Sequence, residues 1–253
     1  MKILGIICVL GTLAASSLAL GAVRAADVRD DEAVRRWLSG MTPPDNVPTS
    51  LAARTERSGR ISNLETVSIE EIAAPPEVKA ALLRNIQLKA SGPQMVPAGD
   101  LPSVASYLGR TSHSLLAEDV IRNRLLVAPS TISKTPLRDA RLLSSSWAGT
   151  SIGGKFTGLS RIFVLQGAGL VEFNEVDYQS GSATVTQIAE ALNDSVAGTP
   201  ATSFMQRSKD GRGMASLTWR TPSKSYELRL FSDEGESVEK HLRLLRKIAE
   251  GVE

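Results

Sequence analysis

The sequence predicts an α+β protein in which an antiparallel sheet of five to six strands, with two packed helices, follows a mainly helical and irregular region. Two observations lead to this fold class. Apolar residues up to about residue 130 recur at the spacing of short helices, whereas beyond Leu137 they tend to recur at every second position. Glycine-containing turns separate the later segments, and the chain closes on a helical pattern. Strands combined with flanking helices in this way are typical of the α+β class.

Residues 26–130 are expected to form short helices separated by segments rich in proline and serine. The clearest helix begins at Pro75-Pro76, because proline is well tolerated in the first helical turn. Its apolar stripe consists of Val78, Ala81, Leu82 and Ile86. A later helix is expected over residues 114–127. The stretch 41–60 lacks periodicity and is expected to be a loop or disordered.

Residues 137–253 are expected to form the α+β domain. Its expected strands lie at residues 142–147, 161–166, 170–178, 202–207, 214–220 and 226–230. The last three form a meander, because Asp210-Gly211 supplies the positive φ angles of a tight turn. In the final strand of the meander apolar and charged residues alternate, so one of its faces is expected to be buried.

Two helices are expected to pack on this sheet. Residues 184–192 match a capping box, with Thr184 at the cap and Gln187 three positions later. Residues 236–250 carry an apolar stripe at helical spacing. The members of that stripe are Val238, Leu242, Leu245 and Ala249.

The first 25 residues have the pattern of an export signal. Lys2 supplies the positive start, an uncharged apolar run extends to Leu20, and small residues at positions 23 and 25 favour cleavage before Ala26. We therefore expect a periplasmic or secreted protein with no stable membrane span after cleavage. An uncleaved anchor is the alternative, since about 18 apolar residues just span a bilayer. The single cysteine, Cys8, lies within the signal, so no disulfide is expected.

The net charge of the chain also comes from the signal. The sequence has 29 basic and 27 acidic side chains, and removing Lys2 and Arg24 leaves equal numbers of each. A globally basic protein that binds nucleic acid is therefore not expected.

No cofactor or metal site is expected. The sequence from Gly149 to Lys155 matches part of a phosphate-binding loop, but Phe156 stands where that loop needs Ser or Thr, and strand-like residues follow. The two histidines, His113 and His241, lie far apart in the sequence, which makes a typical zinc site improbable. His241 is expected at the border of the apolar stripe of the last helix.

Carboxylates on one expected strand suggest an alternative, catalytic function. Glu175 and Asp177 lie two positions apart and so face the same side, and Glu172 lies nearby on the same strand. An exported hydrolase acting on cell-wall or polysaccharide material could use such acids. A structural envelope protein, with residues 26–130 as an extended arm, is a third interpretation.

The preferred hypothesis is a non-catalytic protein whose C-terminal domain binds a protein or an anionic envelope component. It depends on a basic and aromatic surface expected on the meander. Its members are Arg207, Lys209, Arg212, Trp219, Arg220, Lys224 and Tyr226. Cations beside exposed aromatic rings suit anionic or glycan partners. The competing interpretation is that these are charges at the ends of hairpins, above a core that contains Trp219.

Overall fold

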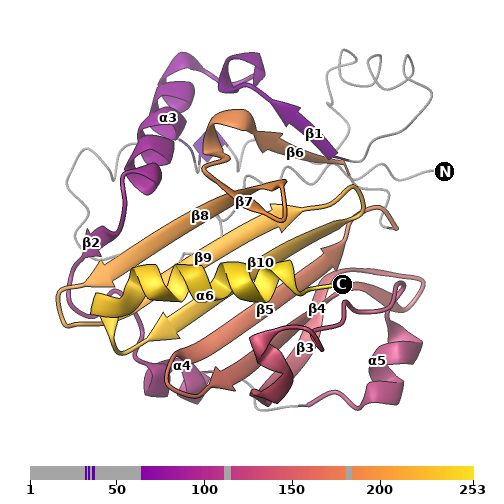
Figure 1. The fold of residues 1–253 in the computed structure, drawn as a ribbon. Helices are drawn as coiled ribbons and strands as arrows, with labels where there is room; N and C mark the ends of the chain where they lie inside the picture. The colour runs from indigo at the N-terminus through magenta and orange to yellow at the C-terminus, as the bar shows by residue number, and fades with distance from the viewer. Residues whose placement is uncertain (1–31, 33, 35, 38–63, 111–114, 181–183) are drawn as a thin grey trace.

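The computed structural model describes residues 32, 34, 36, 37, 64–110, 115–180 and 184–253 (Figure 1). The expected export signal, the expected loop at residues 41–60 and His113 lie outside the described residues.

In the described chain, helices and short strands form the N-terminal part, and most of the long strands lie in the C-terminal part. With η for 3₁₀ helices, the elements are β1 (Leu64–Val67), η1 (Ile69–Glu71), α3 (Pro76–Ala90), β2 (Gln94–Val96), α4 (Val104–Arg110), α5 (Glu118–Arg124), η2 (Pro136–Asp139), β3 (Arg141–Ile152), β4 (Lys155–Leu165), β5 (Gly169–Asp177), β6 (Val185–Ile188), η3 (Ala189–Ala191), β7 (Asp194–Val196), β8 (Thr199–Ser208), β9 (Gly213–Arg220), β10 (Lys224–Ser232), η4 (Gly235–Ser237) and α6 (Val238–Glu250).

An eight-stranded mixed sheet is the centre of the fold (Figure 1). Its strand order is β2-β8-β9-β10-β5-β4-β3, with β7 paired to β8. Neighbouring strands are antiparallel except β2, which runs parallel to β8. The α+β class is confirmed, but the sheet is larger than expected, because β2 and β7 have only 3 residues each and too short a pattern to detect.

The expected meander is present as β8, β9 and β10. In the first of its turns only Gly211 has a positive φ, of 85°, so the loop needs one left-handed residue rather than two. The backbone N–H of Gly211 donates to the carbonyl of Ser208 at 3.1 Å, which closes the turn. This hairpin fixes the register in which Ala201 lies opposite Trp219.

The helix expected over residues 184–192 is wrong. Val185–Ile188 is strand β6, which pairs with β1 in a separate two-stranded parallel sheet, and only Ala189–Ala191 is helical. Val185, Thr186 and Ile188 are β-branched, and such residues fit a pleated strand better than a helix. The partner strand lies about 120 residues earlier in the sequence, so the local capping pattern did not reveal the pairing.

The C-terminal helix α6 covers one face of the large sheet (Figure 1). The expected stripe on this helix is confirmed, since all four of its members are buried. They pack against inward side chains of β9, β10 and β5, which include Leu217, Leu228 and Phe173. These three are fully buried, so this layer is the main apolar core.

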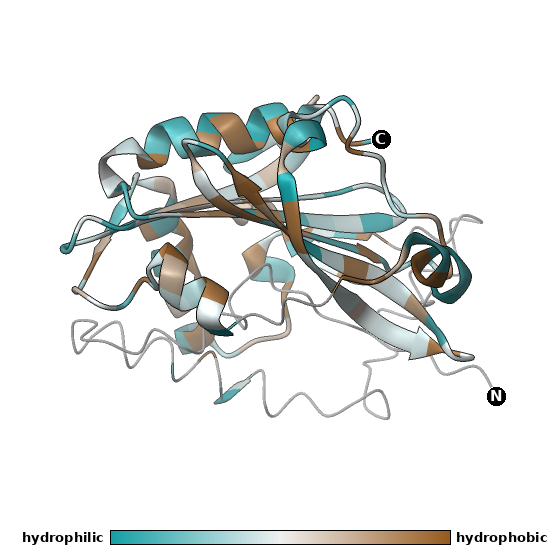
Figure 2. Cartoon of the chain, turned by 90° about the horizontal axis from the view of Figure 1, so that it is seen from below, coloured by the Kyte–Doolittle hydropathy of each residue, from teal (hydrophilic) through white to brown (hydrophobic). Residues whose placement is uncertain are grey.

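Other helices lie on the opposite side of the sheet from α6 (Figure 2). The helix α4 contributes Tyr107 to a cluster with Phe231, and the two rings stack with centroids 4.5 Å apart. The expected helix after Pro75 is confirmed as α3, whose Leu82 is buried beside Ile188. The helix expected over residues 114–127 is shorter than expected and has no buried residue.

Candidate functional site

The seven meander residues do not share one exposed face. Trp219 and Tyr226 are 5 % and 8 % exposed, and their rings stack with centroids 4.8 Å apart within the core under α6. Arg220 is also 5 % exposed. Because neighbours on a strand point to opposite faces, Arg220 lies on the other side of β9 from Trp219. The expectation that these three side chains are exposed is therefore wrong. β9 is buried on both faces, and Tyr226 of β10 packs in the core under α6.

The remaining cations of the meander mostly bond within the fold. Arg207 forms an ion pair with Glu239 of α6 at 3.1 Å. Arg212 donates to the carbonyl of Leu101 at 2.8 Å. Lys209 is exposed at the tip of the hairpin. Binding of a partner by these residues stays a prediction.

Lys224 belongs to a buried ionic cluster around Glu175. The Arg161 guanidinium lies 2.6 Å from one oxygen of the Glu175 carboxylate. The other oxygen accepts the backbone N–H of Ser130 at 2.8 Å and lies 3.5 Å from Lys224 Nζ. Glu175 is 3 % exposed, so the two cations neutralise a carboxylate that is almost fully desolvated.

The three strand carboxylates do not converge on one cleft. Glu172 lies on the opposite face of β5 from Glu175, where it accepts a hydrogen bond from Tyr107 Oη at 3.0 Å. Asp177 accepts the backbone N–H of Ser180 at 2.8 Å. The cavity beside Glu175 and Asp177 has a volume of ≈ 10 Å³, about the space of one water molecule.

The glycine-rich near-match to a phosphate-binding loop is a β-hairpin. The turn between β3 and β4 contains Gly153 and Gly154, both with positive φ. A second strand follows this turn in place of a helix, so no helix N-terminus faces the loop.

His241 is more deeply placed than expected. It is 5 % exposed on α6, and its Nδ1 atom is buried without a hydrogen-bond partner among the described residues. Burial lowers the pKa of His241 below its ordinary value, whereas the charges of Glu234 and Glu239 act in the opposite direction and Lys240 adds to the lowering.

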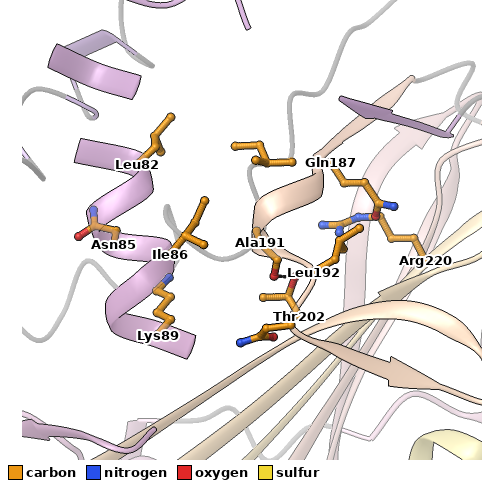
Figure 3. A pocket seen from close by; sticks show the side chains of 11 residues that line it. Leu82, Asn85, Ile86, Lys89, Gln187, Ala191, Leu192, Thr202 and Arg220 are labelled. Carbon is orange, nitrogen blue, oxygen red and sulfur yellow. Dashed lines mark hydrogen bonds between the residues drawn. The ribbon is translucent and has the colours of Figure 1, made fainter. Parts of the chain in front are cut away.

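A cavity of ≈ 50 Å³ lies between α3 and the β6–η3 segment, next to β8 and the end of β9 (Figure 3). Five of the eleven residues that line it are aliphatic. These side chains are Leu82 and Ile86 of α3, with Ile188, Ala191 and Leu192 from the facing segment. The polar lining consists of Asn85, Lys89, Gln187, Asn193, Thr202 and Arg220.

Arg220 is the unusual member of this lining. It extends from the last position of β9, and Figure 3 shows its guanidinium beside Gln187, directed towards the cavity. Its Nε atom is buried without a hydrogen-bond partner, and no acid among the described residues forms an ion pair with it. Burial lowers the pKa of Arg220, while the Tyr178 and Glu227 oxygens act in the opposite direction. A desolvated guanidinium without an anion beside it is energetically costly.

The sequence pointed to Arg220 but not to its surroundings. It was expected on an exposed surface. The signal that could have indicated burial is the absence of any other charge over residues 213–219, on either face of the strand. The aliphatic walls come from α3 and η3, which lie far away in the sequence, and no local pattern connects them with Arg220.

Within the described ranges no group of three or more metal-ligating side chains occurs. The described helices are also all too short or too polar to cross a membrane. No protein-family model, no curated protein and no solved structure matches this chain.

Proposed function

We propose that this chain is a non-catalytic, exported binding protein whose α+β domain binds an anionic partner. The observation that carries the proposal is the buried Arg220 guanidinium, which faces a cavity and has no ion-pair partner among the described residues. Export is supported by the pattern of the first 25 residues.

The charges around the cavity favour an anion. Two cations, Lys89 and Arg220, and no acid are found among the residues that line it. A guanidinium stays protonated at any physiological pH. Because Arg220 is buried, its attraction for a negative group is screened less than it would be at the surface.

A binding role also agrees with the arrangement of the strand carboxylates. General acid–base catalysis on a glycosidic bond needs two carboxyl groups on either side of one substrate. Glu172 and Glu175 face opposite sides of β5, and Glu175 is neutralised by Arg161 and Lys224. We therefore favour binding over the hydrolase alternative.

The test is a titration of the isotopically labelled protein with acetate and with inorganic phosphate at constant ionic strength, followed by NMR. We expect saturable shifts of amide signals from β9 and η3 with at least one of these anions. Arg220→Met is expected to abolish the shifts, whereas Arg243→Met, a matched control at an exposed position of α6, is expected to keep them. Equal binding by the Arg220→Met variant, or the absence of any saturable shift, would overturn the proposal.

A further inference from the structure

We propose that the Arg220 cavity binds a carboxylate carried on a short aliphatic chain of about three to five carbons. This inference rests on the proposed function and names the ligand class of the same site. Such a carboxylate occurs as a free short-chain acid or as the C-terminus of a polypeptide that ends in an aliphatic residue.

The cavity has an apolar part and a cationic part. Leu82 and Ile86 project from α3 towards the β6–η3 segment, while Arg220 lies on the far side of the space beside Gln187 (Figure 3). A ligand that fills the cavity therefore contacts aliphatic side chains on the α3 side and a guanidinium on the opposite side. This distribution suits an amphipathic molecule with its charge at one terminus.

The other polar groups of the lining already have partners in the protein. Gln187 Nε2 donates to Thr66 Oγ1 at 2.8 Å, and Thr202 Oγ1 donates to the carbonyl of Ala191 at 2.9 Å. The side chain of Asn193 bonds to both backbone groups of Ser203, by accepting at 2.7 Å and donating at 3.1 Å.

Asn85 and Lys89 likewise have interactions of their own. Recognition of a polar group in this cavity is therefore left mainly to the Arg220 guanidinium.

A single guanidinium favours a carboxylate over a phosphate. Its planar fork of N–H donors matches the two oxygens of a carboxylate in a bidentate arrangement. Phosphate or sulfate has further charged oxygens, which would meet aliphatic side chains and polar groups that are already bonded within the protein. Burial of unsatisfied charged oxygens is costly, so tetrahedral anions are expected to bind poorly.

The volume sets the length of the aliphatic chain. One water molecule needs about 10–15 Å³ of cavity volume. A cavity of ≈ 50 Å³ therefore accommodates on the order of four water-sized groups. A carboxylate with three to five carbons fills this space, whereas a long fatty acid exceeds it.

Isovalerate is a suitable first probe, and isovaleramide is its neutral control of nearly the same shape. We expect isovalerate to bind the wild-type protein saturably in calorimetry or NMR, at least tenfold more tightly than isovaleramide and than inorganic phosphate. Arg220→Met is expected to weaken isovalerate binding at least tenfold, and Arg220→Lys to restore it in part. The Arg243→Met variant, which replaces an exposed arginine of α6, is expected to bind like the wild type.

Two peptide probes separate the two sources of the carboxylate. Acetyl-Gly-Gly-Val with a free C-terminus and the same peptide with a C-terminal amide differ only in the charged group. Tighter binding of the free-carboxylate peptide than of isovalerate assigns the site to polypeptide C-termini, and the reverse order assigns it to small acids; either result supports a carboxylate site.

The outcomes distinguish this inference from the proposed function. If inorganic phosphate binds more tightly than isovalerate and needs Arg220, the protein binds anions but the carboxylate inference is wrong. If isovaleramide binds as tightly as isovalerate, the charge is irrelevant and both proposals fail. The comparison of isovalerate with isovaleramide uses only the wild-type protein, so it decides the matter even if an Arg220 variant does not fold.

Discussion

Replacing Arg220 by methionine is expected to stabilise the protein, although a buried side chain usually contributes to stability. Arg220 is only 5 % exposed as a residue, it has no ion pair with a described acid, and its Nε is buried without a hydrogen-bond partner. Methionine keeps most of the aliphatic stem and removes the polar group. Since an unsatisfied buried polar group costs about 1–3 kcal/mol, we expect a gain of that order in the free energy of unfolding.

Arg161 provides the matched control with the opposite expected sign. It lies on β4 with its side chain 11 % exposed and 2.6 Å from Glu175. Arg161→Met removes one partner of a buried ion pair, which typically costs about 3–5 kcal/mol. Because Lys224 Nζ remains 3.5 Å from the same carboxylate, we expect the lower end of this range.

Equilibrium unfolding in urea, monitored by tryptophan fluorescence, measures both effects. Trp219 lies in the core and serves as one reporter of its loss. Unchanged slopes of free energy against urea concentration establish that the variants and the wild type unfold in the same way. A loss of more than about 1 kcal/mol in Arg220→Met would refute the reasoning, because it would mean that the fold itself stabilises this charge.

Three further predictions concern other parts of the chain. Gly169→Ala should lower the free energy of unfolding by at least about 1–3 kcal/mol, because a Cβ there would lie 2.1 Å from the Phe231 carbonyl oxygen and φ is 128°; thermal unfolding at an unchanged midpoint would contradict this. Burial lowers the pKa of His241, so its contribution to stability is present above the unfolded value of about 6.5 and is lost as pH falls from there through the folded value. The free energy of unfolding, measured with urea between pH 7.5 and 5, should therefore depend less on pH in His241→Met than in the wild type. An equal pH dependence in the two proteins would count against a lowered pKa of His241. Mass spectrometry of the exported protein should give an N-terminus at Ala26, and an intact Met1 would show that the segment is retained.

The elements that the sequence predicted well are those whose signals are local. The meander was found because a glycine turn separates its first two strands, and α6 was found because its stripe repeats over 13 residues. β6 was mistaken for a helix because its pairing with β1 involves residues distant in the sequence. The exposed aromatic surface was predicted wrongly because all 8 residues of β9 are buried, so polarity did not distinguish its two faces.

For the candidate site, the sequence pattern identified a cation but did not indicate that it lines an enclosed cavity. Arg220 was included among the candidate residues as a surface cation, which is the usual position of arginine. Its burial follows from the packing of Ile86 and Leu192 around the end of β9, and these side chains come together only in the folded chain. Sequence patterns report periodicity along one segment. They do not reveal a cavity that is lined by segments far apart in the sequence.

The parallel pairing of β2 with β8 has a consequence for the order in which the protein folds. Gln94 lies opposite Gln206, about 110 residues later in the chain. The C-terminal hairpins close short loops and can form early, whereas β1, β2 and α3 can be placed only after β6 and β8 exist. We therefore expect β1, β2 and α3 to fold last, and the Arg220 cavity to be complete only at that step. A molecule that occupies the cavity would hold the N-terminal segment in place, so its binding would be coupled to the completion of the fold.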